Sequence, residues 1–89
     1  MISREITIIN KLGLHARAAA KLVSLASNFE SDIRVSKDGK TVNGKSIMGV
    51  MMLAASQNSS ITITIDGNDE QDAMVQLEAL VADRFGEEN

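Results

Sequence analysis

Isoleucine and threonine alternate strictly along the run SSITITIDG, residues 59–67. Successive side chains of a β-strand point to opposite faces of a sheet, so this alternation predicts a strand with one apolar face and one polar face. Antiparallel sheets commonly have one face on the core and one in solvent, whereas the strands of an all-parallel sheet are apolar on both faces. The chain is therefore expected to form a sheet whose apolar face must be covered by other elements.

Three more stretches predict strands of the same half-buried kind. Together with the first run, the predicted strands are residues 4–10 (REITIIN), 32–37 (DIRVSK), 40–43 (KTVN) and 59–67. Asp38 and Gly39 stand between the second and the third, and Asp-Gly is a dipeptide typical of two-residue hairpin turns. These two strands are therefore expected to pair with each other.

Apolar residues recur at helical spacing in three other stretches, which can cover the sheet. Helices are expected from Ala16 to about Phe29, from Ser46 to about Ala54 and from Asp69 to Phe85. The resulting order is βαββαβα, in a four-stranded, mainly antiparallel sheet with three helices on one face. An 89-residue chain is short for one domain, so we predict a single α+β domain over residues 1–89, an open-faced sandwich.

Residues 39–46, GKTVNGKS, match the phosphate-loop pattern G-x-x-x-x-G-K-[ST]. A phosphate loop curls around phosphate groups with consecutive backbone N–H groups, and β-branched Thr41 and Val42 suit a strand better. The hairpin signal before them also favours a strand. We therefore interpret the match as a hairpin strand that leads to Ser46, rather than as a nucleotide site.

Composition and charge narrow the functional classes. The chain has no cysteine, a charged N-terminal stretch and no apolar run near the ~20 residues of a membrane span, so a cytosolic location fits best. Residues 11–45 hold seven Lys or Arg against three acids, and residues 66–89 hold one Arg against eight acids. The basic part could face a phosphate or an acidic partner, or could simply be solvated. The net charge of −3 and 2% aromatic content argue against nucleic-acid binding.

His15, the only histidine, directly precedes the first predicted helix in KLGLHARAAAKL. A helix N-terminus presents unpaired N–H groups and a positive dipole that favour a bound anion, and a neutral imidazole there can act as a nucleophile. Arg17 lies in the first turn, where its guanidinium could meet phosphate oxygens, and Gly13 would allow a tight approach of the loop. The residues alone leave two interpretations open: a phosphorylated histidine with its arginine, or a surface histidine that merely caps the helix beside a solvated charge.

Other chemistries find less support. A Ser-His-acid triad would have to use His15 without a nucleophile-elbow signature, and a metal site would have one imidazole without clustered acids. The acidic start of the last helix suits the helix dipole. We expect no cofactor, no metal and no independent catalytic reaction.

The stretch GKSIMGVMMLAA holds a second candidate site. Ser46 is well suited to cap the short helix that follows it. Val50, Leu53 and Ala54 suffice for the core, so part of the other side could be exposed and dock partners through flexible methionines; the alternative is that these methionines are all core. The candidate partner-binding residues are Ile47, Met48, Met51 and Met52.

The segments LGLHAR, GKTVNGKSIMGVM and DGNDEQDAM closely resemble the HPr family, the histidine-containing phosphocarriers of the bacterial phosphoenolpyruvate:sugar phosphotransferase system. The resemblance spans nearly the whole chain and implies the same βαββαβα sandwich. It implies that His15 accepts a phosphoryl group on Nδ1 from phospho-enzyme I and passes it to the A domains of sugar-specific enzymes II, with assistance from Arg17. It also implies that Ser46 is a target of the ATP-dependent HPr kinase/phosphorylase in the organisms that have this enzyme.

One position departs from the family pattern, which usually reads H-A-R-P where this chain has Ala18. Proline pre-sets the first helical turn, so alanine loses some rigidity while function is expected to survive. Two alternatives to sugar-linked relay remain: a carrier of the nitrogen-related regulatory branch, and a regulatory adaptor that binds partners without turnover at His15. The chain is expected to be a monomer. It is also expected to act as a substrate both of the enzyme that donates the phosphoryl group and of the enzymes that receive it.

Overall fold

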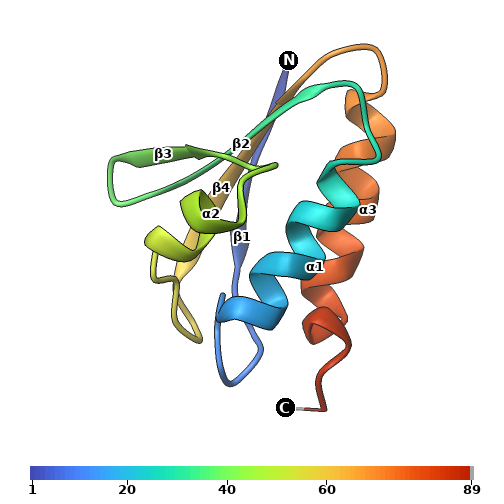
Figure 1. Cartoon of the computed structure of the whole chain (residues 1–89). Coiled ribbons are helices and arrows are strands. Elements are labelled where there is room, and N and C mark those ends of the chain that lie inside the picture. Colours follow the sequence, from blue (N-terminus) through green and yellow to red (C-terminus); the bar gives the residue numbers. More distant parts are fainter. Residues whose placement is uncertain (89) are drawn as a thin grey trace.

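The protein is a sheet with helices on one face (Figure 1). A computed structural model describes residues 1–88. In chain order the elements are β1 (Ile2–Thr7), α1 (Ala16–Ala26), β2 (Asp32–Lys37), β3 (Lys40–Asn43), α2 (Ile47–Met52), β4 (Ser60–Asp66), α3 (Glu70–Ala82) and the 3₁₀ turn η1 (Arg84–Gly86). The predicted order βαββαβα is confirmed.

The sheet has the order β1-β4-β2-β3, and all neighbouring strands are antiparallel. Ile63 of the central strand β4 stands opposite Arg4 of β1 and opposite Val35 of β2. The isoleucines at 61, 63 and 65 are fully buried, whereas Thr62 and Thr64 on the other face are only half-buried. The alternation in the sequence therefore predicted correctly which face of β4 lies against the helices.

Helices α1 and α3 lie side by side across the apolar face of the sheet, and α2 packs against α1 and β3 (Figure 1). The core between sheet and helices is built from aliphatic side chains of both layers, with Phe85 of η1 as its largest fully buried member. The start of α1 and the end of the chain lie at the same end of the molecule (Figure 1). This arrangement brings residues near position 15 close to residues near position 87.

The first helix and the first strand end earlier than their patterns predict. α1 ends at Ala26 instead of near Phe29. Beyond Ala26 the backbone tightens, because the N–H groups of Asn28 and Phe29 donate to the carbonyl oxygens three residues back, at 3.1 Å and 3.2 Å, instead of four residues back. β1 covers Ile2–Thr7 rather than residues 4–10. The strand stops where its partner β4 begins, because Thr7 pairs with Ser60.

The second and third helices are also shorter than predicted. α2 ends at Met52, and Ala54, which was expected in the core, is exposed with φ of 50°, while Ala55 is buried in its place. A positive φ takes the chain out of the helix, so helical spacing no longer places the following residues. α3 ends at Ala82, and Phe85 reaches the core from η1 with φ of 54°.

The phosphate-loop match forms a hairpin, as predicted. Lys37 pairs with Lys40, and Asp38 and Gly39 between them both have positive φ, at 50° and 82°, as a type I′ turn requires. The remaining residues of the match form β3, a turn and the N-cap of α2. The stretch therefore lacks the backbone curl that would cradle phosphates.

Candidate functional site

His15 is the N-cap residue of α1 and joins the helix to a tightly held loop. Its backbone is extended, with φ of −72° and ψ of 178°, and its carbonyl oxygen accepts from the Ala19 N–H at 2.8 Å. Its side chain makes no capping hydrogen bond, so the imidazole does not serve as a helix cap. The side chain is 28% exposed, which leaves the ring accessible to a partner.

Gly13 fixes the course of this loop. Its φ is +66°, and a Cβ atom added to it would meet the backbone of Ala55 and Ser56, with Ser56 Cα only 2.9 Å away. The next residue, Leu14, donates its N–H to the Ala55 carbonyl oxygen at 2.8 Å. The predicted tight approach at Gly13 is therefore present, and it sets the position of His15 two residues later.

Glu87 is the residue near His15 that sequence reasoning missed. Its Oε2 is hydrogen-bonded to Nε2 of His15, in a half-buried contact between residues 72 apart in sequence. Its Oε1 accepts from Nδ2 of Asn10 at 2.9 Å. These bonds lower the pKa of the Glu87 carboxyl, the Asn10 amide contributing most and the His15 ring next. No motif or spacing connects these positions, so only the fold could bring them together.

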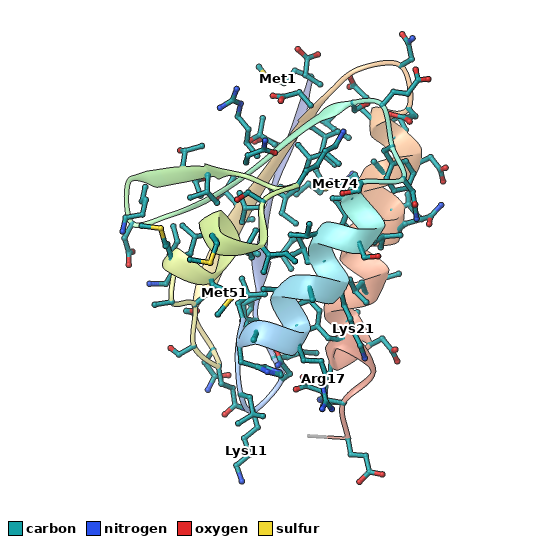
Figure 2. All side chains as sticks on the ribbon, in the orientation of Figure 1. Met1, Lys11, Arg17, Lys21, Met51 and Met74 are labelled. Atoms are coloured by element: carbon teal, nitrogen blue, oxygen red, sulfur yellow. The ribbon has the colours of Figure 1, made fainter. Side chains whose placement is uncertain are left out.

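An open pocket of about 630 Å³ lies beside His15. Arg17 is exposed on α1 and lines it, and within residues 1–88 it forms no ion pair. Figure 2 shows Arg17 and Lys11 at the end of the molecule where α1 begins and the chain ends. The residues that line the pocket are Lys11, Leu12, His15, Ala16, Arg17, Glu87 and Glu88. An anion that entered it would meet a helix start, an imidazole and two cationic side chains, and also the two carboxylates of Glu87 and Glu88.

Ser46 stands at a separate place, at the start of α2. Its Oγ accepts from the Gly49 N–H at 3.1 Å, so it caps the helix as predicted. Gly49 lies close to its surroundings, because an added Cβ would come within 3.2 Å of both Ser46 Oγ and the Val42 side chain. The serine is half-buried, and its capping bond is a sufficient structural reason for a serine here.

The apolar side chains of α2 are exposed rather than buried. Ile47 is 44% exposed, Met48 70%, Met51 38% and Met52 63%, whereas Val50 is fully buried. We call these four exposed residues the α2 patch. The interpretation that its methionines are all core is therefore wrong, while Val50 and Leu53 are buried as expected. Figure 2 shows Met51 on α2, on the side of the molecule away from α3.

Comparison with known proteins identifies the family. The sequence model of the family PTS-HPr, described as "PTS HPr component phosphorylation site", matches residues 2–83. The chain belongs to the HPr family. Phosphocarrier protein HPr of Cupriavidus necator is 61% identical to it over 87 residues, which are 98% of each chain. The chain is thus a phosphocarrier of the phosphotransferase-system family, and the resemblance seen in the sequence is confirmed.

Solved HPr structures have the same fold. The crystal structure of HPr-C-His from Thermoanaerobacter tengcongensis matches with a TM-score of 0.96 at 48% identity and covers 100% of both chains. The crystal structure of an HPr dimer from the same organism matches with a TM-score of 0.79 at 48% identity, over 98% of this chain and 100% of that one. The open-faced sandwich is therefore the HPr fold.

The departure from the family pattern at position 18 lies inside the core. Ala18 is the third residue of α1 and is fully buried. The first N–H groups of a helix have no acceptor within the helix, so a proline here would remove no helical hydrogen bond. The alanine therefore changes packing and stiffness beside His15 rather than the hydrogen bonding of α1.

Two other features bear on what this HPr-family chain can bind. No three His, Asp or Glu side chains among residues 1–88 are grouped so that they could hold a metal ion. Over the same range, none of the helices combines the length and the apolar character needed to cross a bilayer.

Proposed function

We propose that the chain accepts a phosphoryl group from phospho-enzyme I on Nδ1 of His15 and passes it to the A domains of sugar-specific enzymes II. The observation that carries the proposal is the hydrogen bond between Nε2 of His15 and Glu87. It occupies one ring nitrogen and leaves the other as the nucleophile beside an open pocket at a helix start. The protein itself acts as the carrier and as a substrate of its partner enzymes.

The transfer step needs no cofactor in this proposal. The Nδ1 lone pair attacks phosphorus and forms the N–P bond to His15. At the same time the bond between phosphorus and the donor enzyme breaks, and its electron pair stays on the donor. The transferred phosphoryl oxygens are met by the positive end of α1 and by Arg17, which is free to swing towards them. The reverse sequence at His15 releases the group to the acceptor.

The α2 patch supports docking of the partner enzymes in this scheme. It offers three methionines and one isoleucine, and flexible apolar side chains adapt to more than one partner surface. In the same proposal, phosphorylation of Ser46 regulates docking by placing about two negative charges next to the patch, which would repel an acidic partner. The carrier is proposed to work as a monomer, which a mass measurement in solution would test.

Mass spectrometry tests the proposed function directly. The chain and its His15→Ala variant are incubated with enzyme I, phosphoenolpyruvate and Mg²⁺, and intact masses are compared. The expected result is a single acid-labile phosphate on the chain that retains His15 and none on the His15→Ala variant. Absence of phosphate on both proteins would overturn relay and favour a regulatory adaptor that works through the α2 patch. Transfer of the phosphoryl group to enzymes II of the sugar-linked system would favour a role in sugar transport over a role in the nitrogen-related branch.

A further inference from the structure

Asn10 is fully buried and braces the loop that carries His15. Its carbonyl oxygen accepts from the Gly13 N–H at 3.1 Å, and its side-chain Nδ2 donates to the Gly13 carbonyl oxygen at 2.8 Å. The second Nδ2 hydrogen is directed to Oε1 of Glu87 at 2.9 Å. Both partners of Nδ2 can only accept, so the orientation of the amide is determined by its surroundings.

Burying Asn10 leaves one of its polar atoms unpaired, which indicates that the hydrogen bonds donated by its Nδ2 have a role. Oδ1 of Asn10 is buried without a hydrogen-bond partner among residues 1–88. Leaving a buried acceptor unpaired is unfavourable, and an apolar side chain of similar size would avoid it. A bond to the Gly13 carbonyl alone would brace the loop. The bond to Glu87 is the one that reaches the candidate site.

Glu87 is held from two directions. Phe85, two residues earlier, is fully buried, and its carbonyl oxygen accepts from Nζ of Lys21 at 2.6 Å. The backbone is thus anchored just before Glu87, while Asn10 holds one carboxylate oxygen. The other oxygen then has one partner within residues 1–88, the His15 ring. The side chain of Glu87 is only 16% exposed, so water competes weakly for it.

We propose that Asn10 is a positioning residue that holds Glu87 against Nε2 of His15 and so selects Nδ1 as the phosphoryl acceptor. This inference rests on the proposed function and deepens it. A carboxylate at Nε2 keeps the proton on that nitrogen, so the lone pair stays on Nδ1. When Nδ1 bonds to phosphorus the ring gains positive charge at Nε2–H, directly opposite Glu87; when the phosphoryl group leaves, the charge disappears.

Nuclear magnetic resonance can test the geometry without any partner enzyme. His15 is the only histidine, so its ring signals need no separate assignment. In the unmodified chain we expect a slowly exchanging Nε2–H proton and an unprotonated Nδ1. Asn10→Asp keeps the size of the side chain, and at a pH above the pKa of the new carboxyl it removes both donors and repels Glu87. The Nε2–H signal should then be lost, as in Glu87→Ala, and in Asn10→Ala the pKa of Glu87 should rise towards its ordinary value.

Kinetics with enzyme I test the consequence. Asn10→Asp should lower kcat for phosphoryl acceptance about tenfold, as expected for loss of one charge-assisted hydrogen bond. KM for the carrier should not change, because the α2 patch is untouched. Asn28→Asp, which adds the same charge at an exposed position, is the matched control and should leave both kcat and KM unchanged.

A double variant separates positioning from loop bracing. If Asn10 acts through Glu87, then Asn10→Asp/Glu87→Ala is no slower than Glu87→Ala. A further tenfold loss in the double variant, or a persistent Nε2–H signal in folded Asn10→Asp, would overturn the proposal. Should Asn10→Asp not fold, Asn10→Ser, whose hydroxyl can donate to only one acceptor, takes its place with the same expectation. If the unmutated chain shows the Nε2–H signal but takes up no phosphate from enzyme I, the proposed function is refuted while the proposed geometry stands.

Discussion

Lys21 of α1 donates from Nζ to the carbonyl oxygen of Phe85 at 2.6 Å and ties the end of the chain to the first helix. Lys21→Met keeps the apolar stem and removes the donor. We expect a loss of about 1 kcal/mol in the free energy of unfolding and a shift of the His15 ring signals, because Glu87 follows Phe85 by two residues. Urea unfolding and NMR measure the two effects. Lys40→Met, at an exposed position in β3, should change neither.

Acid should weaken the contact between the residues just before β2 and the start of α3. The Asp69 carboxylate accepts from the Ser31 hydroxyl and from the N–H groups of Glu30 at 2.9 Å and Ser31 at 3.0 Å. The Ser31 hydroxyl is the main cause that lowers the Asp69 pKa below its ordinary value, and the Glu30 N–H is the next. Because the folded-state pKa is depressed, this stabilisation is fully present above the unfolded-state pKa and is lost as pH falls through the folded-state value.

Asp69→Asn tests this pH dependence by urea unfolding at neutral and strongly acidic pH. The variant should be less stable than the unmodified chain at neutral pH, and the difference should shrink in acid. Asp72→Asn removes a carboxyl from the first turn of the same helix and leaves the Ser31 bonds intact, so it serves as control. An equal difference between Asp69→Asn and the unmodified chain at both pH values would contradict the explanation.

Alanine variants of two glycines with positive φ distinguish the energetic cost of backbone strain from that of steric contact. Gly39→Ala meets no atom within 4 Å, so it should cost only the strain of a left-handed alanine, about 1 kcal/mol. Gly13→Ala adds a clash with the backbone of Ala55 and should cost about 3 kcal/mol or more. It should also displace His15 and slow phosphoryl acceptance. Equal losses of unfolding free energy would show that the loop relaxes freely.

The α2 patch predicts a docking effect without a stability effect. Met48→Glu changes the most exposed patch residue, at 70% exposure. We expect KM for transfer from enzyme I to rise several-fold, with stability unchanged within about 0.5 kcal/mol. Val75→Glu, at an apolar α3 position that is 65% exposed, is the control and should leave KM near its original value. A similar rise in KM for both variants would argue against specific docking at the patch.

Ser46 allows the capping role and the charge effect to be separated. Ser46→Ala removes the Oγ acceptor of the Gly49 N–H and should cost about 1 kcal/mol in unfolding free energy with little change in partner affinity. Ser46→Asp keeps a good N-cap and adds negative charge beside the patch, so stability should be retained while affinity for the partners falls. Calorimetric titration with enzyme I and urea unfolding provide the readouts. Unchanged affinity in Ser46→Asp would refute electrostatic control.

Much of the architecture could be predicted from local pattern. Alternating Ile and Thr predicted the buried face of β4, and Asp38-Gly39 predicted the hairpin, because strand faces and two-residue turns depend on neighbouring residues. The place of His15 directly before α1 and the capping role of Ser46 were predicted for the same reason. Element ends were less well predicted. After Ser27 the backbone hydrogen bonds reach back three residues instead of four, and Ala54 has a positive φ, and neither change is visible in the apolar spacing.

By itself the sequence determined the elements, the face of each that is apolar, and the histidine that adjoins a helix start. Only the tertiary structure decided what surrounds that histidine. Asn10 and Glu87 lie 77 residues apart and meet because α3 and η1 return the chain to the start of α1. Such a contact depends on the packing of whole helices on a sheet, and no spacing within the sequence encodes it.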